Sequence, residues 1–110
     1  MTLKDVKTML SGITGFDKKV AYRAFPEGEA PALPFICYIA TYTDNFFADD
    51  QVYKIIQYID IELYSENKDE ASEKLIEATL DANNIGWNKE EEYISTEDMY
   101  EVIYSISIDM

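Results

Sequence analysis

The amino-acid sequence predicts an α+β fold: a mixed, mostly antiparallel sheet of about five strands with two helices packed on one face. Two segments repeat apolar residues at helical spacing, and several others alternate apolar and polar residues with the period of a strand. A chain of 110 residues fits one domain, residues 1–110. At this length folding buries roughly two-thirds of the unfolded surface, so a stable core needs no disulfide or metal.

The first third of the chain is expected to form a helix, a short strand and a loop. Residues 2–11 form the helix, which Thr2 caps and which ends near Gly12. Its expected buried face consists of Leu3, Val6, Met9, Leu10 and Ile13. Residues 19–25 are expected to form a strand, and the stretch from Pro26 to Pro34 contains all three prolines and is predicted to be a loop.

Two strands are predicted in the middle of the chain. Residues 35–43 are apolar on both faces, which indicates a strand covered on both sides. Residues 52–64 alternate, which indicates one core face and one wet face. The expected core face consists of Tyr53, Ile55, Ile59, Ile61 and Leu63, interrupted only by Gln57. The segment between the two strands, Asp44–Asp50, is predicted to be a loop.

The second helix is predicted to begin with a capping box and to end near Ala82. Asn67 is the expected cap and Glu70 lies three residues later. The expected buried residues are Ala71, Leu75, Ile76, Ala78, Thr79 and Ala82. Residues 87–95 are acidic and poorly apolar, as suits an edge strand. A turn at 95–98 then leads into a strongly alternating strand, residues 99–109.

The order of these elements also predicts part of the topology. The strand at 52–64, the second helix and the strand at 87–95 form a β-α-β unit with parallel strands. The strand at 99–109 returns antiparallel through a short turn. Because it is far more apolar than the acidic strand, it is expected to lie centrally, with the acidic strand at the sheet edge.

The net charge of the chain excludes some classes of binding partner. Nine Lys and Arg residues oppose 22 Asp and Glu residues, giving a net charge of −13. Lys and Arg form no stripe of the kind that binds phosphates, so nucleic acid is not an expected partner, and anionic membranes are disfavoured for the same reason. Two interpretations of the acidic surface stay open: it keeps the protein soluble, or it steers the protein toward basic partners.

The residues present do not support catalysis. The chain has no histidine, and its single cysteine, Cys37, lies in an apolar run where a buried and inert thiol is expected. The four glycines are scattered and form no phosphate loop. Asp44, Asp49 and Asp50 lack the spacing of a calcium loop, and consecutive glutamates at 90–92 point to opposite faces of a strand. We therefore expect no catalytic residue, no metal and no cofactor.

The location of the protein is judged from the N-terminus and the apolar runs. The N-terminal residues are polar and amphipathic, unlike a secretory signal. No apolar run approaches the ~18 residues of a membrane span. A cytoplasmic origin is expected.

Exposed aromatic residues suggest a surface for a protein partner. Phe46 and Phe47 are adjacent in a loop rimmed by acids, so on most backbones they do not both reach one core. The alternative is that one of them tucks under the loop. Nine tyrosines are a second indication, although β-propensity also explains them. The candidate assembly interface consists of Asp44, Asn45, Phe46, Phe47, Asp49, Asp50, Tyr58 and Tyr64.

Short sequence words across residues 33–106 resemble a known family. They are Leu33–Tyr38, Asn45-Phe46, Ala48-Asp49-Asp50, Val52-Tyr53, Ile61–Tyr64, Lys68-Asp69, Tyr93-Ile94 and Met99–Tyr104. Their pattern is similar to the tail-completion, or head–tail joining, proteins of long-tailed bacteriophages and prophages, which resemble tail terminators.

The resemblance implies a role in virion assembly. Such proteins are non-enzymatic, use no cofactor and form rings, commonly hexameric, at the head-proximal end of the tail tube. The implied partners are other phage tail or head-connector proteins, and the implied location is the virion tail, assembled in the host bacterial cytoplasm. The resemblance also implies that the loop 44–50 makes ring or tube contacts. The alternative function is an acidic binding module or inhibitor that mimics nucleic acid or occupies a basic cleft.

Overall fold

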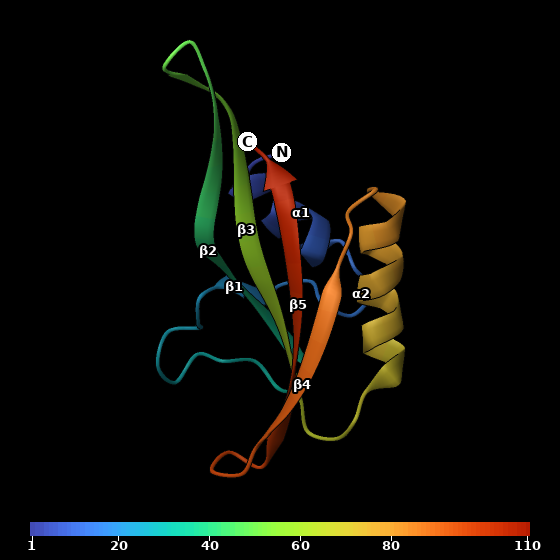
Figure 1. Ribbon diagram of the computed structural model, residues 1–110. Helices are drawn as coiled ribbons and strands as arrows, with labels where there is room; N and C mark the ends of the chain where they lie inside the picture. The colour runs from blue at the N-terminus through green and yellow to red at the C-terminus, as the bar shows by residue number, and fades with distance from the viewer.

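The computed structural model describes the backbone of residues 1–110 and every side chain except that of Tyr53. Along the chain it contains α1 (Leu3–Ser11), β1 (Val20–Tyr22), β2 (Phe35–Ala48), β3 (Gln51–Ser65), α2 (Glu70–Ala82), β4 (Asn88–Ile94) and β5 (Met99–Asp109) (Figure 1). The predicted α+β class is confirmed. The predicted core-facing orientation of Tyr53 lies outside the described residues.

The strands form one sheet in the order β1-β2-β3-β5-β4. The β1–β2 pairing is parallel, and the other three pairings are antiparallel. β5 lies between β3 and β4, as its stronger apolar alternation predicted, so β3 and β4 run parallel on either side of it. The acidic strand β4 is at one edge of the sheet and β1 is at the other.

One apolar core lies between the sheet and the helices. Fully buried residues of both helices, Val6, Leu10, Ile76 and Leu80, join one cluster with alternate residues of the strands, including Ile36, Ile59, Ile61, Leu63 and Tyr104. Because both helices share this cluster, both cover the same face of the sheet. Gln57 interrupts the apolar row of β3 as predicted, and its side-chain amide donates to the backbone oxygens of Tyr42 and Tyr58 at 3.0 and 2.9 Å. These bonds offset the cost of burying it.

The structure corrects the prediction of a loop at Asp44–Asp50 between the two long strands. β2 continues through Asp44–Ala48, and β3 already begins at Gln51. Only Asp49 and Asp50 form the turn, both with positive φ (50° and 62°), as in the two-residue turns that match the twist of a hairpin. The composition that indicated a loop belongs to a hairpin whose two faces are both exposed to solvent. Backbone hydrogen bonds between β2 and β3, and not burial of one face, hold this part of β2 in place.

The buried face of α2 was also predicted wrongly. Of the six residues expected to be buried, Ile76 is buried and Thr79 is half-buried, whereas Ala71, Leu75, Ala78 and Ala82 are exposed. The buried face consists of Ser72, Glu73, Ile76 and Leu80. The prediction placed only apolar and small residues in the core. In the structure a carboxylate, Glu73, is buried on the side of α2 that faces β4, and the apolar Leu75 is exposed.

Smaller corrections concern the cap of α2 and the length of β1. Asp69, not Asn67, caps α2, because its side chain accepts from the Ser72 backbone N–H at 3.0 Å. The predicted strand at 19–25 is reduced to Val20–Tyr22. At the other helix the Thr2 cap is confirmed, and Asp5 completes a capping box with it.

An ion-pair network fixes α2 to β4. The Glu73 side chain is only 4% exposed, and its carboxylate oxygens lie 2.7 Å from the Lys68 Nζ and 3.1 Å from the Lys89 Nζ. Lys89 also lies 2.7 Å from the Glu77 carboxylate, which accepts a hydrogen bond from the Tyr104 hydroxyl at 2.7 Å. Removing one lysine would leave a buried charge incompletely compensated.

Two neighbouring residues of α2 test the observed helix face. We expect Ile76→Ala to lower the free energy of unfolding by about 2–5 kcal/mol, because the side chain is fully buried. The matched substitution Leu75→Ala should stay within about 0.5 kcal/mol of wild type, because Leu75 is 42% exposed. Urea unfolding of both variants measures the difference, and equal losses would contradict the observed face.

Candidate protein-docking surface

The candidate docking surface is the free part of the β2–β3 hairpin. β3 pairs with β5 from Ile56 onward, so residues 44–55 have no third strand beside them in the described sheet. We call residues 44–55 the arm. Figure 1 shows it projecting well beyond the end of β5. Its exposed apolar side chains are Phe46 (45%), Phe47 (64%), Val52 (45%) and Ile55 (37%).

The predicted residues Asp44, Phe46 and Tyr58 come together along one side of the hairpin. At the root of the arm, the rings of Tyr42 and Tyr58 stack with centroids 4.3 Å apart. The Tyr58 hydroxyl donates to the Asp44 carboxylate at 3.1 Å, and this hydrogen bond raises the pKa of Tyr58. Farther out, the Lys54 ammonium lies 6.0 Å from the Phe46 ring centroid. Aromatic and charged side chains therefore alternate along this side of the hairpin.

Phe46 and Phe47 belong to different cross-strand pairs. Phe46 is opposite Lys54, Phe47 is opposite Val52, and the register shifts between them. Neither Phe side chain is buried in the core. The alternative in which one of them tucks under a loop is therefore excluded.

Of the remaining predicted interface residues, three lie in the arm and one lies far from it. Asn45 is opposite Ile55 within the arm, and Asp49 and Asp50 form its tip. Tyr64 is far from the arm, at the other end of β3, where its ring centroid lies 5.4 Å from that of Phe35. Sequence reasoning missed Tyr42, Val52 and Ile55 as surface residues. Continuing the alternation of β2 past Thr43 would have revealed the exposed pairs.

Tyr64 belongs to a second cluster, on the sheet face opposite the helices. Cys37 and Glu101 there are 3% and 7% exposed, and Glu62 is half-buried. Burial raises the pKa of Cys37 to about 11, with the Glu62 and Glu101 charges adding to the shift, so the thiol is protonated at neutral pH. Burial and the neighbouring Glu101 carboxylate also raise the pKa of Glu62, to about 7.

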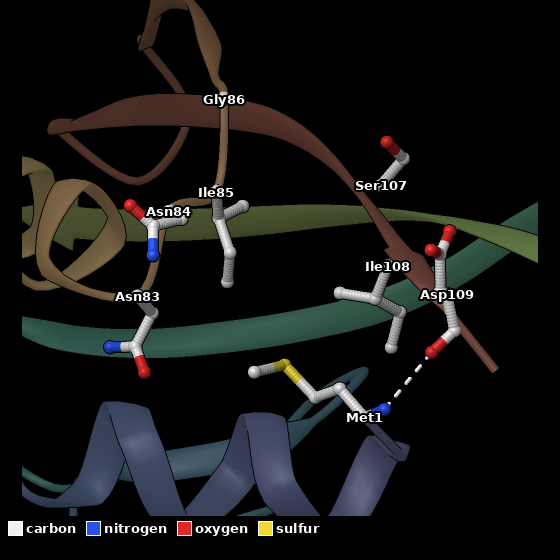
Figure 2. Close-up of a pocket in the computed structure, with 8 residues that line it drawn as sticks. All are labelled: Met1, Asn83, Asn84, Ile85, Gly86, Ser107, Ile108 and Asp109. Carbon is white, nitrogen blue, oxygen red and sulfur yellow. Dashed lines mark hydrogen bonds between the residues drawn. The ribbon is translucent and has the colours of Figure 1, made fainter.

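The protein has several surface pockets, and in one of them the titratable side chains of Lys68, Glu73, Glu77 and Lys89 pair with one another. Figure 2 shows another, of about 350 Å³, between the N-terminus, the end of α2 and the end of β5, lined by Met1, Asn83–Gly86 and Ser107–Asp109. The Met1 amino group donates to the Asp109 backbone oxygen at 3.0 Å, which joins two of the residues that line this pocket. Among the described residues, no three His, Cys, Asp or Glu side chains are arranged to hold a metal ion.

No protein-family model, curated protein or solved structure matches this chain. Within the described residues, neither helix has the length and apolar character needed to cross a membrane.

The Glu62–Glu101 cluster predicts a pH dependence of stability. A carboxyl group with its pKa raised from 4.5 to about 7 binds more protons in the folded state than in the unfolded state across that interval. The free energy of unfolding should therefore fall as pH rises from about 4.5 to about 7. The chain has no histidine to titrate in the same window. Thermal melts of wild type and Glu62→Gln measure the effect, and an unchanged pH dependence in the variant would exclude Glu62 as its source.

Proposed function

We propose that this protein is a non-enzymatic structural component of a phage or prophage tail. It caps the tail tube, or joins the tail to the head, through protein–protein contacts and acts as a ring of copies. The observation that carries the proposal is the arm, a hairpin that extends beyond the end of β5 and exposes large apolar side chains on both of its strands, Phe46 and Phe47 on β2 and Val52 and Ile55 on β3.

The arm is suited to docking because it is already ordered in the free protein. Its two strands are paired from Asp44 opposite Ile56 to Ala48 opposite Gln51, with one register shift between Phe46 and Phe47, and the turn is only two residues long. A preformed strand pair loses little conformational entropy on binding. Exposed aromatic side chains surrounded by polar groups are the usual anchors of protein interfaces.

The charge of the arm supports a basic partner surface. Asp44, Asp49 and Asp50 lie at its base and tip, and Lys54 is its single cation. Acidic groups around apolar anchors speed the encounter with a basic partner and fix the orientation of binding. This arrangement fits assembly on another protein of the tail or the head connector.

Removing both aromatic anchors tests the role of the arm. We expect Phe46→Ser with Phe47→Ser to abolish binding to tail-tube protein while changing the free energy of unfolding by less than about 1 kcal/mol, because both side chains are exposed. Co-sedimentation with assembled tail tubes measures binding, and thermal unfolding measures stability.

Leu75→Ser is the matched control, because Leu75 is an exposed apolar residue on α2, far from the arm in the fold (Figure 1). It should bind tubes as wild type does. Undiminished binding by the double Phe variant would contradict the proposal. Salt-sensitive binding to a basic enzyme, without affinity for tail proteins, would instead indicate the acidic inhibitor.

A further inference from the structure

The two open edges of the sheet carry opposite charge. β1 is bracketed by Lys18 and Lys19 on one side and by Arg23 on the other. β4 contains three consecutive glutamates, Glu90–Glu92. We call residues 18–23 the β1 edge and residues 88–94 the β4 edge. Each belongs to an outermost strand of the sheet, with its other side unpaired in the described sheet.

The charges of these edges remain available to a partner. Among the described residues, Lys18, Arg23, Glu90 and Glu92 take part in no ion pair, whereas Lys89 and Lys68 are held by glutamates of α2 and β4. Lys18, Arg23, Glu90 and Glu92 are also exposed. The β1 edge is therefore a free basic strand, and the β4 edge displays free carboxylates.

The helix layer repeats the same asymmetry. Residues 1–25 hold five of the nine basic residues against only two acids. α1 packs beside β1 and exposes Lys4, Lys7 and Asp5, a net positive charge, whereas α2 is fixed to β4 and exposes Glu70, Asp81 and Lys74, a net negative charge. Each copy is thus basic on its β1 side and acidic on its β4 side, in both layers.

Strand directions are compatible with pairing between copies. From the pairings within the sheet, β1 and β4 run in opposite directions. If a second copy continues the sheet with its strands in the same orientation, its β1 lies antiparallel to β4 of the first. This is the slightly more stable type of strand pair.

We propose that the β4 edge of one copy pairs with the β1 edge of a second copy of this chain, which extends the sheet across the interface. The contact is head-to-tail, and such a contact generates a ring when its repeated rotation about one axis completes a full turn. Because β1 has only three residues, a single contact is weak, and ring closure or alignment on a partner supplies the avidity that stabilises it. The inference deepens the proposed function, because it names the contact by which the ring of copies would form.

Charge reversal on each edge tests the pairing in sedimentation velocity at low ionic strength. Wild type should show a sedimentation coefficient that rises with concentration, and the rise should shrink at about 0.15 M salt, where the Debye length is about 8 Å. Glu90→Lys with Glu92→Lys makes both edges basic, and Lys18→Glu with Arg23→Glu makes both acidic. Each double variant alone should lose the association.

Mixing the two double variants should restore association, because each reversed edge then finds an edge of opposite charge. This outcome also shows that both variants are folded. The matched control, Glu27→Lys with Glu29→Lys, makes the same charge change in the loop before β2 and should associate at least as well as wild type. A concentration-independent wild type, or variants that associate as wild type does, would overturn the pairing.

The arm variant separates this inference from the proposed function. Phe46→Ser with Phe47→Ser should self-associate as wild type does, although it is expected to lose binding to tail tubes. If edge reversal leaves self-association intact while the arm variant loses tube binding, the edge pairing fails and the tail function stands. If the edges behave as described but tubes are bound by neither wild type nor variants, the pairing stands and the tail function fails.

Discussion

The length of β3 is the constraint on which the rest of the structure depends. Over residues 56–65 it lies between β2 and β5, and its alternate residues Ile59, Ile61 and Leu63 are fully buried under the helices. Toward its N-terminal end it extends past β5 and retains only β2 as a partner. The same strand therefore supplies the centre of the core and one side of the arm, so the orientation of the arm is fixed by the packing of the core.

The excess of acid is tolerated because it is sorted by position. Glu73 and Glu77 are neutralised by lysines at the α2–β4 contact, and on the opposite face of the sheet burial and the neighbouring Glu101 carboxylate raise the pKa of Glu62. Most of the remaining carboxylates are exposed to water in the arm, the helices, the β4 edge and the loops. Since five of the nine basic residues lie in the first 25 residues, the charge differs between the two edges of the sheet.

Sequence patterns correctly predicted the elements that bury one apolar face against the core. They failed where a segment buries neither face, as in the arm, or buries a charged residue, as in α2. β5 was located at its observed bounds because Val102, Tyr104, Ile106 and Ile108 alternate with polar residues. Within the arm, Asp44–Asp50 was predicted to be a loop because neither face of this segment carries the apolar alternation of a strand that contacts a core. For α2, the rule that apolar residues face the core placed Leu75 inside, since a single sequence does not reveal that two lysines compensate a buried Glu73.

The sequence by itself determined the α+β class, the order of the strands from β3 to β4, the positions of most elements, and the buried position of Cys37. These follow from local periodicity, caps and turn residues, which act over a few positions. Only the tertiary structure decided that Asp44–Asp50 is strand and turn, that Tyr64 is separate from the arm, and which edges remain open. Those features depend on register between distant strands and on the point where β5 ends, and no local pattern encodes either.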